Sequence, residues 1–262
     1  MTRPRIYSIS LKLLLVLFIF PTVIHAQGHL PKNYVPELLV CSYPGQNAKD
    51  SIYLEYDWDR KITSITVKFG GARGVPRKFK IRITYNEDGQ MAVLTETPID
   101  TDAYPQQTYR FTYSSVFLDK IWFDDGQNRD EVKVEYSAPT NTYNIDYKNL
   151  WQNFVFDKGD LLAKRIKGYE VFAVHRNEEE KLGIMRYVRQ QLPFQIVSET
   201  LGSSQLVFYV LCNYQVDLLE YNYQNIFLLN KRDEYGRIAQ IDFSSDQLGT
   251  FQTTTIDYKP LK

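Results

Sequence analysis

The chain has 262 residues, and its 31 basic and 31 acidic side chains leave it with no net charge. A protein that binds nucleic acid or an anionic membrane concentrates an excess of Lys and Arg on one face, so this balance argues against both classes. The 20 Tyr and 15 Phe residues are instead typical of pleated, half-buried β-strands.

Residues 1–26 have the layout of a secretory signal peptide. Basic side chains within 1–12 precede an uncharged apolar run, 13–24, of about 12 residues, whereas a bilayer-spanning helix needs roughly 20. Ala26 offers a small residue at the cleavage point. We therefore expect a periplasmic or secreted protein, or one held at the cell surface, with no transmembrane helix in its mature form. An uncleaved N-terminal anchor is the alternative, and the absence of a Cys directly after the apolar run argues against a lipid anchor.

The rest of the chain reads as antiparallel β-structure. We expect 27–50 to be a partly flexible N-terminal segment and 51–262 to be a single domain. Stretches such as 79–85 and 109–113 alternate apolar and polar residues with period two, as strands with one packed and one wet face do. Turn sequences such as Asp88-Gly89 join strands that are neighbours in the chain. The expected fold is all-β, an antiparallel meander of hairpins that forms an extended curved sheet or a barrel-like structure.

Helix is expected to be scarce. In residues 177–191, apolar side chains recur every three residues, which fits a helix. The same residues also fit a hairpin in which 177–181 is the turn and 182–188 is the returning strand. We prefer the hairpin because strands surround this region, and we expect 205–211 to form a strand as well.

A hairpin unit recurs along the chain. An aromatic residue ends a strand, an acidic or Asn residue opens a turn that often contains Gly, and an aliphatic residue opens the next strand. The copies are 56–62, 85–91, 156–161 and 233–238. Repeats of this kind indicate a sheet in which each unit buries its apolar face against its neighbours.

This unit resembles the YD repeats of Rhs-type bacterial surface proteins, whose pattern runs Tyr-Asp-x-x-Gly-Arg-Ile/Leu-x-x-Ile. The best match is Asp233 to Ile241, although Arg232 stands where the pattern has Tyr. Similar degenerate repeats occur in exported bacterial proteins of unknown function, many of them curved or barrel-like β-meanders. The resemblance implies that kind of fold and carries over no catalytic residue. The chain is too short for the full shell that the repeats of Rhs proteins form around a toxin.

Cys41 and Cys212 are the only cysteines, and their place in an exported chain leaves two readings open. In an oxidising compartment they can form a disulfide that ties the start of the mature chain to its last third. They can equally be two buried thiols that pack as small apolar groups.

Trp58 is the best candidate for ligand binding. It lies in a turn between Asp57 and Asp59, where a large ring is hard to bury. Exposed aromatic rings beside acids stack on sugars or anchor a partner. Trp122 and Trp151 lie in strand-like apolar settings, so we expect both in the core.

Residues Asp124, Asn128 and Asp130 place oxygen atoms on alternate positions, somewhat as a calcium loop does. The Gly at the sixth position and the distant Glu of an EF-hand are missing. The calcium site is therefore an alternative to a plain polar hairpin loop.

No catalytic or cofactor motif stands out, and we expect no cofactor. His175 has no Gly-x-Ser-x-Gly motif to supply the serine of a triad, and acids in turns have conformational reasons to be there. We therefore expect a non-enzymatic binding or structural module of the bacterial cell envelope, with a glycan or an envelope protein as partner. An outer-membrane β-barrel and a glycan hydrolase with an unrecognised site are the alternatives.

Overall fold

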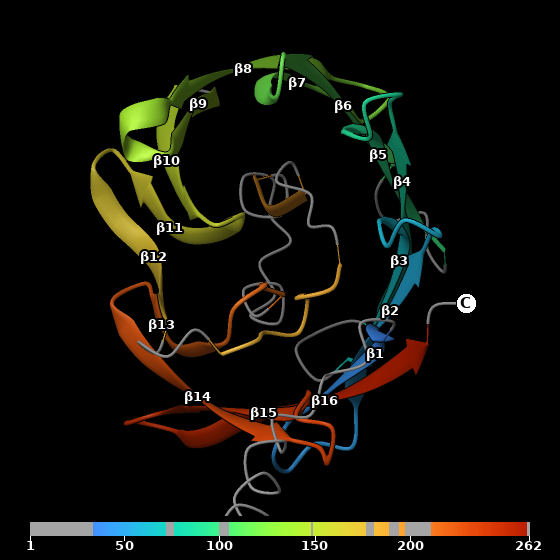
Figure 1. Cartoon of the computed structure of the whole chain (residues 1–262), viewed down its shortest axis with the longest axis vertical. Coiled ribbons are helices and arrows are strands. Elements are labelled where there is room, and N and C mark those ends of the chain that lie inside the picture. Colours follow the sequence, from blue (N-terminus) through green and yellow to red (C-terminus); the bar gives the residue numbers. More distant parts are fainter. Residues whose placement is uncertain are drawn as a thin grey trace, which may run out of the picture.

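The computed structural model describes residues 34–71, 76–99, 105–147, 149–176, 181–188, 194–196 and 211–260. In this part of the chain sixteen strands form a closed barrel, in which each strand pairs antiparallel with its neighbours in sequence and β1 pairs with β16 (Figure 1). The expected all-β antiparallel meander is confirmed, and it closes on itself. No helix among these residues is long and apolar enough to cross a membrane.

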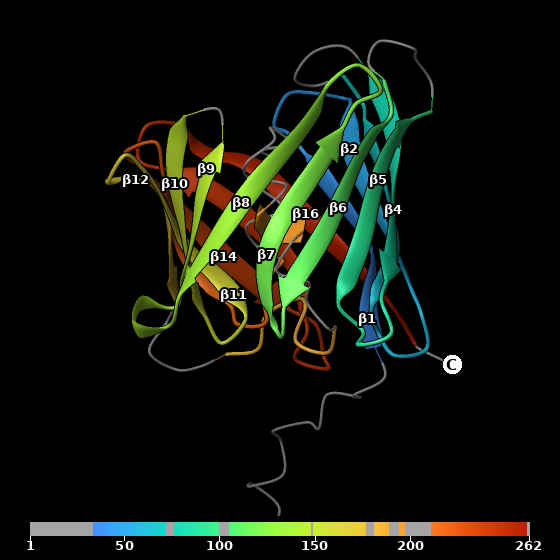
Figure 2. The ribbon, with the colours of Figure 1, turned by 90° about the horizontal axis from the view of Figure 1, so that it is seen from above.

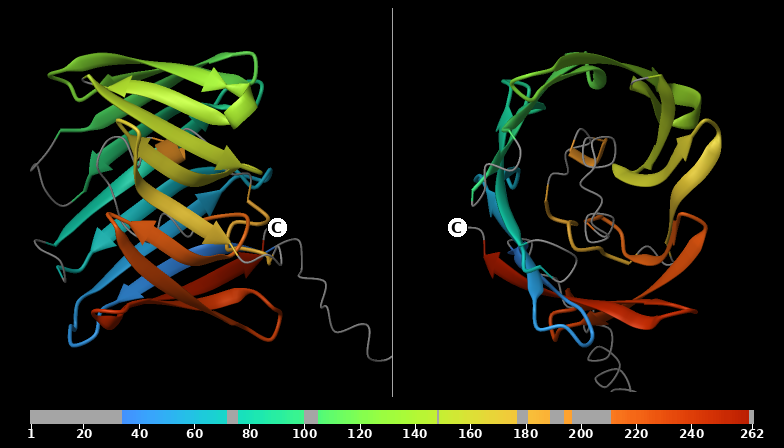
Figure 3. Two further views of the ribbon diagram at one scale, coloured as in Figure 1. Left: turned by 90° about the vertical axis from the view of Figure 1, so that its left-hand side faces the viewer. Right: turned by 180° about the vertical axis from the view of Figure 1, so that it is seen from behind.

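The described elements are, in chain order, β1 Tyr34–Ser42, β2 Lys49–Tyr56, β3 Ile62–Phe69, β4 Arg77–Tyr85, β5 Met91–Pro98, β6 Gln107–Ser114, β7 Phe117–Asp124, β8 Arg129–Ser137, the 3-10 helix η2 Ala138–Thr140, β9 Thr142–Tyr147, β10 Leu150–Asp157, β11 Asp160–Ile166, β12 Tyr169–Arg176, β13 Val216–Tyr221, β14 Gln224–Arg232, β15 Ile238–Ser245 and β16 Gly249–Pro260. The barrel wall thus reaches back to Tyr34, inside the segment 27–50 that was expected to be partly flexible. The strands run obliquely around the barrel (Figures 2 and 3), as closure of a sheet requires.

The two faces of the barrel wall differ sharply. In β2, Ile52 and Leu54 are buried whereas Tyr53 and Glu55 are exposed, and β4 alternates in the same way. Where burial alternates in this way, the buried side chains of the wall point into the barrel. The inner face is predominantly apolar, and its apolar side chains form one cluster around the barrel, with a few polar side chains such as Gln152 and Thr254 buried beside them.

The lumen holds part of the connection between β12 and β13. An eight-stranded barrel is filled by its own side chains, but sixteen strands leave more space. Here residues 181–188, 194–196 and 211–215, called the inserted segment, lie inside the ring of strands (Figure 1). Its apolar residues, such as Met185 and Ile196, are buried in the same cluster as the inner wall. Residues 184–187 form a turn and residue 182 forms an isolated bridge, so the expected returning strand 182–188 is wrong.

One end of the barrel carries a repeated turn, and we call this end the turn rim. Turns 57–61, 86–90 and 233–237 share three hydrogen bonds. In each turn the backbone N–H of the first residue donates to the carbonyl of the fifth residue at 2.9–3.0 Å. The N–H of the fourth residue donates to the carbonyl of the first residue. The N–H of the fifth residue donates to the side-chain oxygen of the first residue. The fourth residue has φ near +70° in each turn: Arg60 (66°), Gly89 (76°) and Gly236 (78°). This geometry explains the Asp or Asn and the frequent Gly of the sequence repeat.

A strand-end tyrosine links each such turn to the next hairpin. Tyr85 donates its hydroxyl hydrogen to the carbonyl of Ile62 at 2.5 Å, and Ile62 is the first residue after turn 57–61. Tyr113 bonds the carbonyl of Met91 in the same way at 2.8 Å. Tyr258 repeats the contact with Ile238 at 3.0 Å. The aromatic residue and the aliphatic residue of the repeat are thus partners across neighbouring hairpins.

The copy at 156–161 departs from the repeat. Asp157 pairs directly with Asp160, and only Lys158 and Gly159, both with positive φ, form the turn. This hairpin is a tight two-residue turn. It lies where the inserted segment meets the wall.

Candidate functional site

The inserted segment forms a short backbone ladder with itself. Gly183 donates its N–H to the carbonyl of Asn213 at 2.9 Å, and Met185 donates to Cys212 at 3.0 Å. A Cβ atom on Gly183 would overlap the carbonyl oxygens of Cys212 and Tyr214. Glycine is therefore needed at this position for the two stretches to approach each other.

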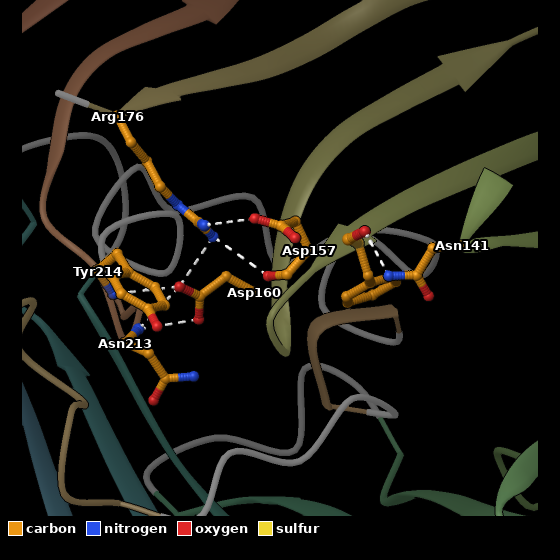
Figure 4. Close-up of polar contacts among 7 residues, drawn as sticks. Asn141, Asp157, Asp160, Arg176, Asn213 and Tyr214 are labelled. Atoms are coloured by element: carbon orange, nitrogen blue, oxygen red, sulfur yellow. Dashed lines mark hydrogen bonds and ion pairs between the residues drawn. The ribbon is translucent and has the colours of Figure 1, made fainter. Parts of the chain in front are cut away.

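Asp160 anchors this ladder to the barrel wall (Figure 4). The side chain lies at the start of β11 and is fully buried. Its carboxylate accepts the backbone N–H of Asn213 at 2.8 Å, the N–H of Tyr214 at 3.2 Å and a guanidinium hydrogen of Arg176 at 3.0 Å. One buried carboxylate thus holds the inserted segment and β12 together.

Arg176 completes the anchor from the end of β12. Its guanidinium also bonds the carboxylate of Asp157 at 3.1 Å and lies 5.0 Å from the ring centre of Tyr214 (Figure 4). Burial raises the pKa of Asp160, while the amide of Asn213 and the charge of Arg176 oppose that rise. Removing one partner of such a buried pair leaves an uncompensated charge, so the anchor is costly to break.

The anchor has the chemistry of a structural lock. Its carboxylates, guanidinium and backbone amides bond one another, and no nucleophile with an adjacent base is among them. His175 lies on the opposite face of β12 and pairs with Glu220 at 3.0 Å on the outside of the barrel. Among the described residues no group of three or more His, Cys, Asp or Glu side chains is placed to hold a metal.

The structure joins Cys41 and Cys212 by no disulfide, and both side chains are buried. Cys41 lies buried on β1, where its sulfur accepts the hydroxyl of Thr254 at 3.4 Å. Cys212 is buried in the inserted segment, and burial raises its pKa well above the ordinary range. Both behave as small packed groups, which was the other reading.

Trp58 is exposed, as its place in a turn predicts. Its relative accessibility is 88%, the highest among the large apolar side chains of the described residues. Asp57 accepts the N–H groups of Asp59 and Lys61, both at 2.9 Å, and Asp59 forms an ion pair with Lys61 at 3.2 Å. The two acids therefore build and flank the turn, and ligand binding by these three residues stays a prediction.

In the predicted calcium loop, the carboxylates of Asp124 and Asp125 bond other residues of the same turn. Asp124 accepts the N–H of Gly126 at 2.8 Å and pairs with Arg129 at 3.0 Å. Asn128 donates both its backbone and its side-chain N–H groups to Asp125. Asp130 lies on the adjacent strand β8. The arrangement is a self-bonded turn, and calcium binding by Asp124, Asn128 and Asp130 stays a prediction.

Trp122 and Trp151 are not in the core. They lie on the outer face of β7 and β10 with exposed fractions of 42% and 50%. Their apolar strand neighbours suggested burial, but those neighbours point inward while each Trp points outward. The alternation of the strand could have predicted the outward direction of Trp151. Gln152, Phe154 and Phe156 point inward, and Trp151 occupies an odd position between such inward residues, so it belongs to the outer face.

Trp151 lines an open groove at the end of the barrel opposite the turn rim. Asp146, Asn149 and Lys167 form its other walls, and its volume is about 310 Å³. Asn149 and Lys167 both have positive φ in adjacent hairpin turns, and Lys167 donates its N–H to the carbonyl of Trp151 at 3.1 Å. An exposed ring thus lies among a carboxylate, an amide and an ammonium group.

Comparison with known proteins finds similarity only to solved structures of low sequence identity. No protein-family model matches the chain, and no curated protein matches its sequence significantly. Similar solved structures include a porin-like protein from Bacteroides uniformis, 11% identical with a TM-score of 0.43, where the match covers 85% of this chain and 96% of that one. A porin-like protein from Bacteroides vulgatus is 12% identical with a TM-score of 0.48, covering 87% and 100% respectively.

Proposed function

We propose that this protein is an exported β-barrel that stands in water as a non-enzymatic binding module of the cell envelope. The outer wall is the observation that carries the proposal. Ion pairs between outward side chains recur around the circumference: Lys80–Glu55 (3.4 Å), Lys120–Glu131 (2.9 Å), Arg165–Glu170 (3.3 Å), Lys231–Asp242 (2.8 Å) and Lys259–Glu37 (3.3 Å).

A membrane barrel needs the opposite arrangement. It presents an apolar band about 25 Å tall to the lipid and keeps polar side chains inside. Lys80 and Lys120 lie in the middle of β4 and β7 and face outward, where each would cost roughly 2–4 kcal/mol at a bilayer midplane. The apolar inner face and charged outer face therefore favour an aqueous compartment over the outer-membrane alternative.

The solubility of the purified protein tests this part of the proposal. We expect it to remain monodisperse without detergent in size-exclusion chromatography and to give no conductance in planar lipid bilayers. Fractionation with the membrane, or a requirement for detergent, would contradict it.

The Trp151 groove is the surface that we propose for ligand binding, with a carbohydrate as ligand class. An exposed indole face packs on the apolar face of a sugar ring, and Asp146, Asn149 and Lys167 supply hydrogen-bond groups at its edge. Trp58 is a second exposed ring, at the turn rim. The repeated turn supports the proposed kinship with YD repeats, which likewise belong to surface proteins.

A screen of bacterial polysaccharides and peptidoglycan fragments tests the groove. Trp151→Ala is expected to abolish binding that the unmodified protein shows. Trp122→Ala is the matched control, because Trp122 has similar exposure on the outer wall and lies outside the groove. Equal loss in both variants, or no carbohydrate bound by the unmodified protein, would overturn the assignment. Turnover of any glycan would favour the hydrolase alternative.

A further inference from the structure

A second concave site lies at the turn rim, where the inserted segment meets the wall. Its walls come from four strands and the inserted segment, and we call it the arginine cleft. It is lined by Tyr34, Leu182, Gly183, Ile184, Arg186, Tyr187, Arg232, Gly236, Arg237, Ile238 and Tyr258. Three of these residues are arginines, and within the described part of the chain no Asp or Glu is among the lining residues.

Arg237 is fixed in place on one side of the cleft. Its Nε donates to the carboxylate of Asp233 at 2.7 Å, and its guanidinium lies within 4.8–4.9 Å of the ring centres of Tyr34, Tyr235 and Tyr258. Asp233 is also committed to the N–H groups of its own turn. The Arg237 guanidinium is therefore already ordered before a ligand arrives, so binding costs it little side-chain entropy.

Arg232 carries a charge that its hydrogen-bond partners do not balance. Its guanidinium donates to the carbonyl oxygens of Gly236 and Leu182 and to the side-chain oxygen of Gln215, all of them neutral acceptors. Partial burial disfavours the charged form of Arg232 and lowers its pKa, while the charges of Asp217 and Asp233 act in the opposite direction. A bound anion would relieve that cost.

Arg186 supplies the third cation from the inserted segment. It is exposed, lies 5.2 Å from the ring centre of Tyr214 and forms no ion pair within the described part of the chain. A guanidinium that is free of carboxylates presents two parallel N–H donors to an incoming anion. The cleft thus joins two ordered cations and one available cation.

The size of the cleft restricts its ligand. The enclosed space is about 20 Å³, too small to bury a drug-sized molecule, so a ligand would enter with a small terminal group and leave the rest of itself in solvent. Planar guanidinium forks match the oxygen pairs of phosphate better than they match a monatomic ion. We propose that the arginine cleft binds a phosphoryl group, either as free phosphate or at the end of a larger molecule.

Calorimetric titration of the purified protein with inorganic phosphate, at constant ionic strength set by chloride, tests the proposal. We expect saturable binding with one phosphate per chain. Arg186→Ala should weaken the affinity about tenfold or more, since a charge-assisted hydrogen bond is lost. Arg186→Lys, which keeps the charge and loses the fork, should fall between the two.

Arg110→Ala is the control, because Arg110 is an exposed arginine on the outer face of β6. It removes the same charge and should change the phosphate affinity less than about twofold. Absence of saturable binding, or equal weakening by Arg110→Ala and Arg186→Ala, would overturn the proposal. Vesicles containing phosphatidic acid that compete with phosphate would assign the site to a lipid headgroup, and failure to compete would assign it to soluble phosphoryl compounds.

Discussion

Asp57 and Asp157 occupy the same place in two hairpins, each directly after an aromatic residue that ends a strand, yet they use their carboxylates differently. Asp57 accepts two N–H groups of its own turn. Asp157 forms an ion pair with Arg176 at the end of β12. Asp160, three residues further along the chain, accepts a backbone hydrogen bond from the inserted segment. The repeated turns are self-contained, whereas the hairpin that departs from the repeat holds together parts of the chain that are far apart in sequence.

Asp160→Ala is expected to have the largest effect on stability, because it removes the acid that links distant parts of the chain. Two backbone N–H groups and the guanidinium of Arg176 lose their buried acceptor, so we expect a loss of about 3–5 kcal/mol in the free energy of unfolding, measured by urea denaturation. Asp157→Ala removes a half-exposed acid from the same arginine and should cost less than about 1 kcal/mol. Equal effects of the two variants would show that Asp160 is no special anchor.

Gly183→Ala probes the other side of the anchor. The new Cβ would overlap the carbonyls of Cys212 and Tyr214, and overpacking of this kind costs about 1–3 kcal/mol. Hydrogen exchange should accelerate at Gly183 and Met185 while the outer strands stay protected. Gly126→Ala is the control for backbone strain alone, since φ is +84° there and a Cβ meets no atom within 4 Å. Unchanged exchange at Met185 would contradict the role of Gly183.

Asp233→Asn tests how an acid of the repeated turns contributes to the pH dependence of stability. Burial acts to raise the pKa of Asp233, but hydrogen bonds from Arg237 and the Arg237 charge together hold it below its ordinary value of 3.8. A lowered folded-state pKa gives stability that is present above the unfolded value and lost as pH falls through the folded one. We expect the free energy of unfolding of the protein to exceed that of the Asp233→Asn variant by about 1–2 kcal/mol at pH 7. This difference should shrink as the pH falls into the acid range.

Asp160→Asn should show the opposite pH trend. Burial raises the pKa of Asp160, so its proton-linked stability is greatest below the ordinary value of 3.8 and declines as pH rises through the folded value. The difference between the protein and this variant should therefore widen toward acid. The measurement is the free energy of unfolding of the protein and of both variants from pH 3 to pH 7. If Asp233→Asn and Asp160→Asn change the free energy of unfolding with the same pH dependence, the two kinds of turn acid do not differ as proposed.

The smallest effect is expected for Tyr85→Phe. The change removes one hydrogen bond to the carbonyl of Ile62 and should cost about 0.5–1.5 kcal/mol. Tyr53→Phe is the matched control, because Tyr53 is exposed on the outer face and its loss should be near zero. If both substitutions are neutral, the tyrosine contacts between hairpins do not contribute to stability.

Local features of this fold were readable from the sequence because they depend on neighbours in the chain. Alternation in 79–85 predicted a strand with one wet face, and β4 has that face. The repeated Asp or Asn predicted turns, and the turns at 57–61, 86–90 and 233–237 share one geometry.

Features that depend on distant partners were not readable. The outward direction of Trp151 follows from the phase of its strand in a closed wall, and its apolar neighbours concealed that phase. The anchor joins Asp160 to Asn213, 53 positions away, and no pattern along the chain marks that pair. Three groups of residues lie outside the described part of the chain: 177–180 and 189–191, which belong to the expected helix or hairpin, and 205–210, which belong to the expected strand 205–211.

The pairing of β1 with β16 joins the two ends of the meander and closes the barrel. Tyr34 lies opposite Pro260, so the last edge of the barrel can be sealed only by the final strand of the chain. Until that strand arrives, β1 presents an unpaired edge that can recruit another chain. A barrel closed by such a distant contact is expected to fold slowly, because the loop entropy is lost before the contact is gained.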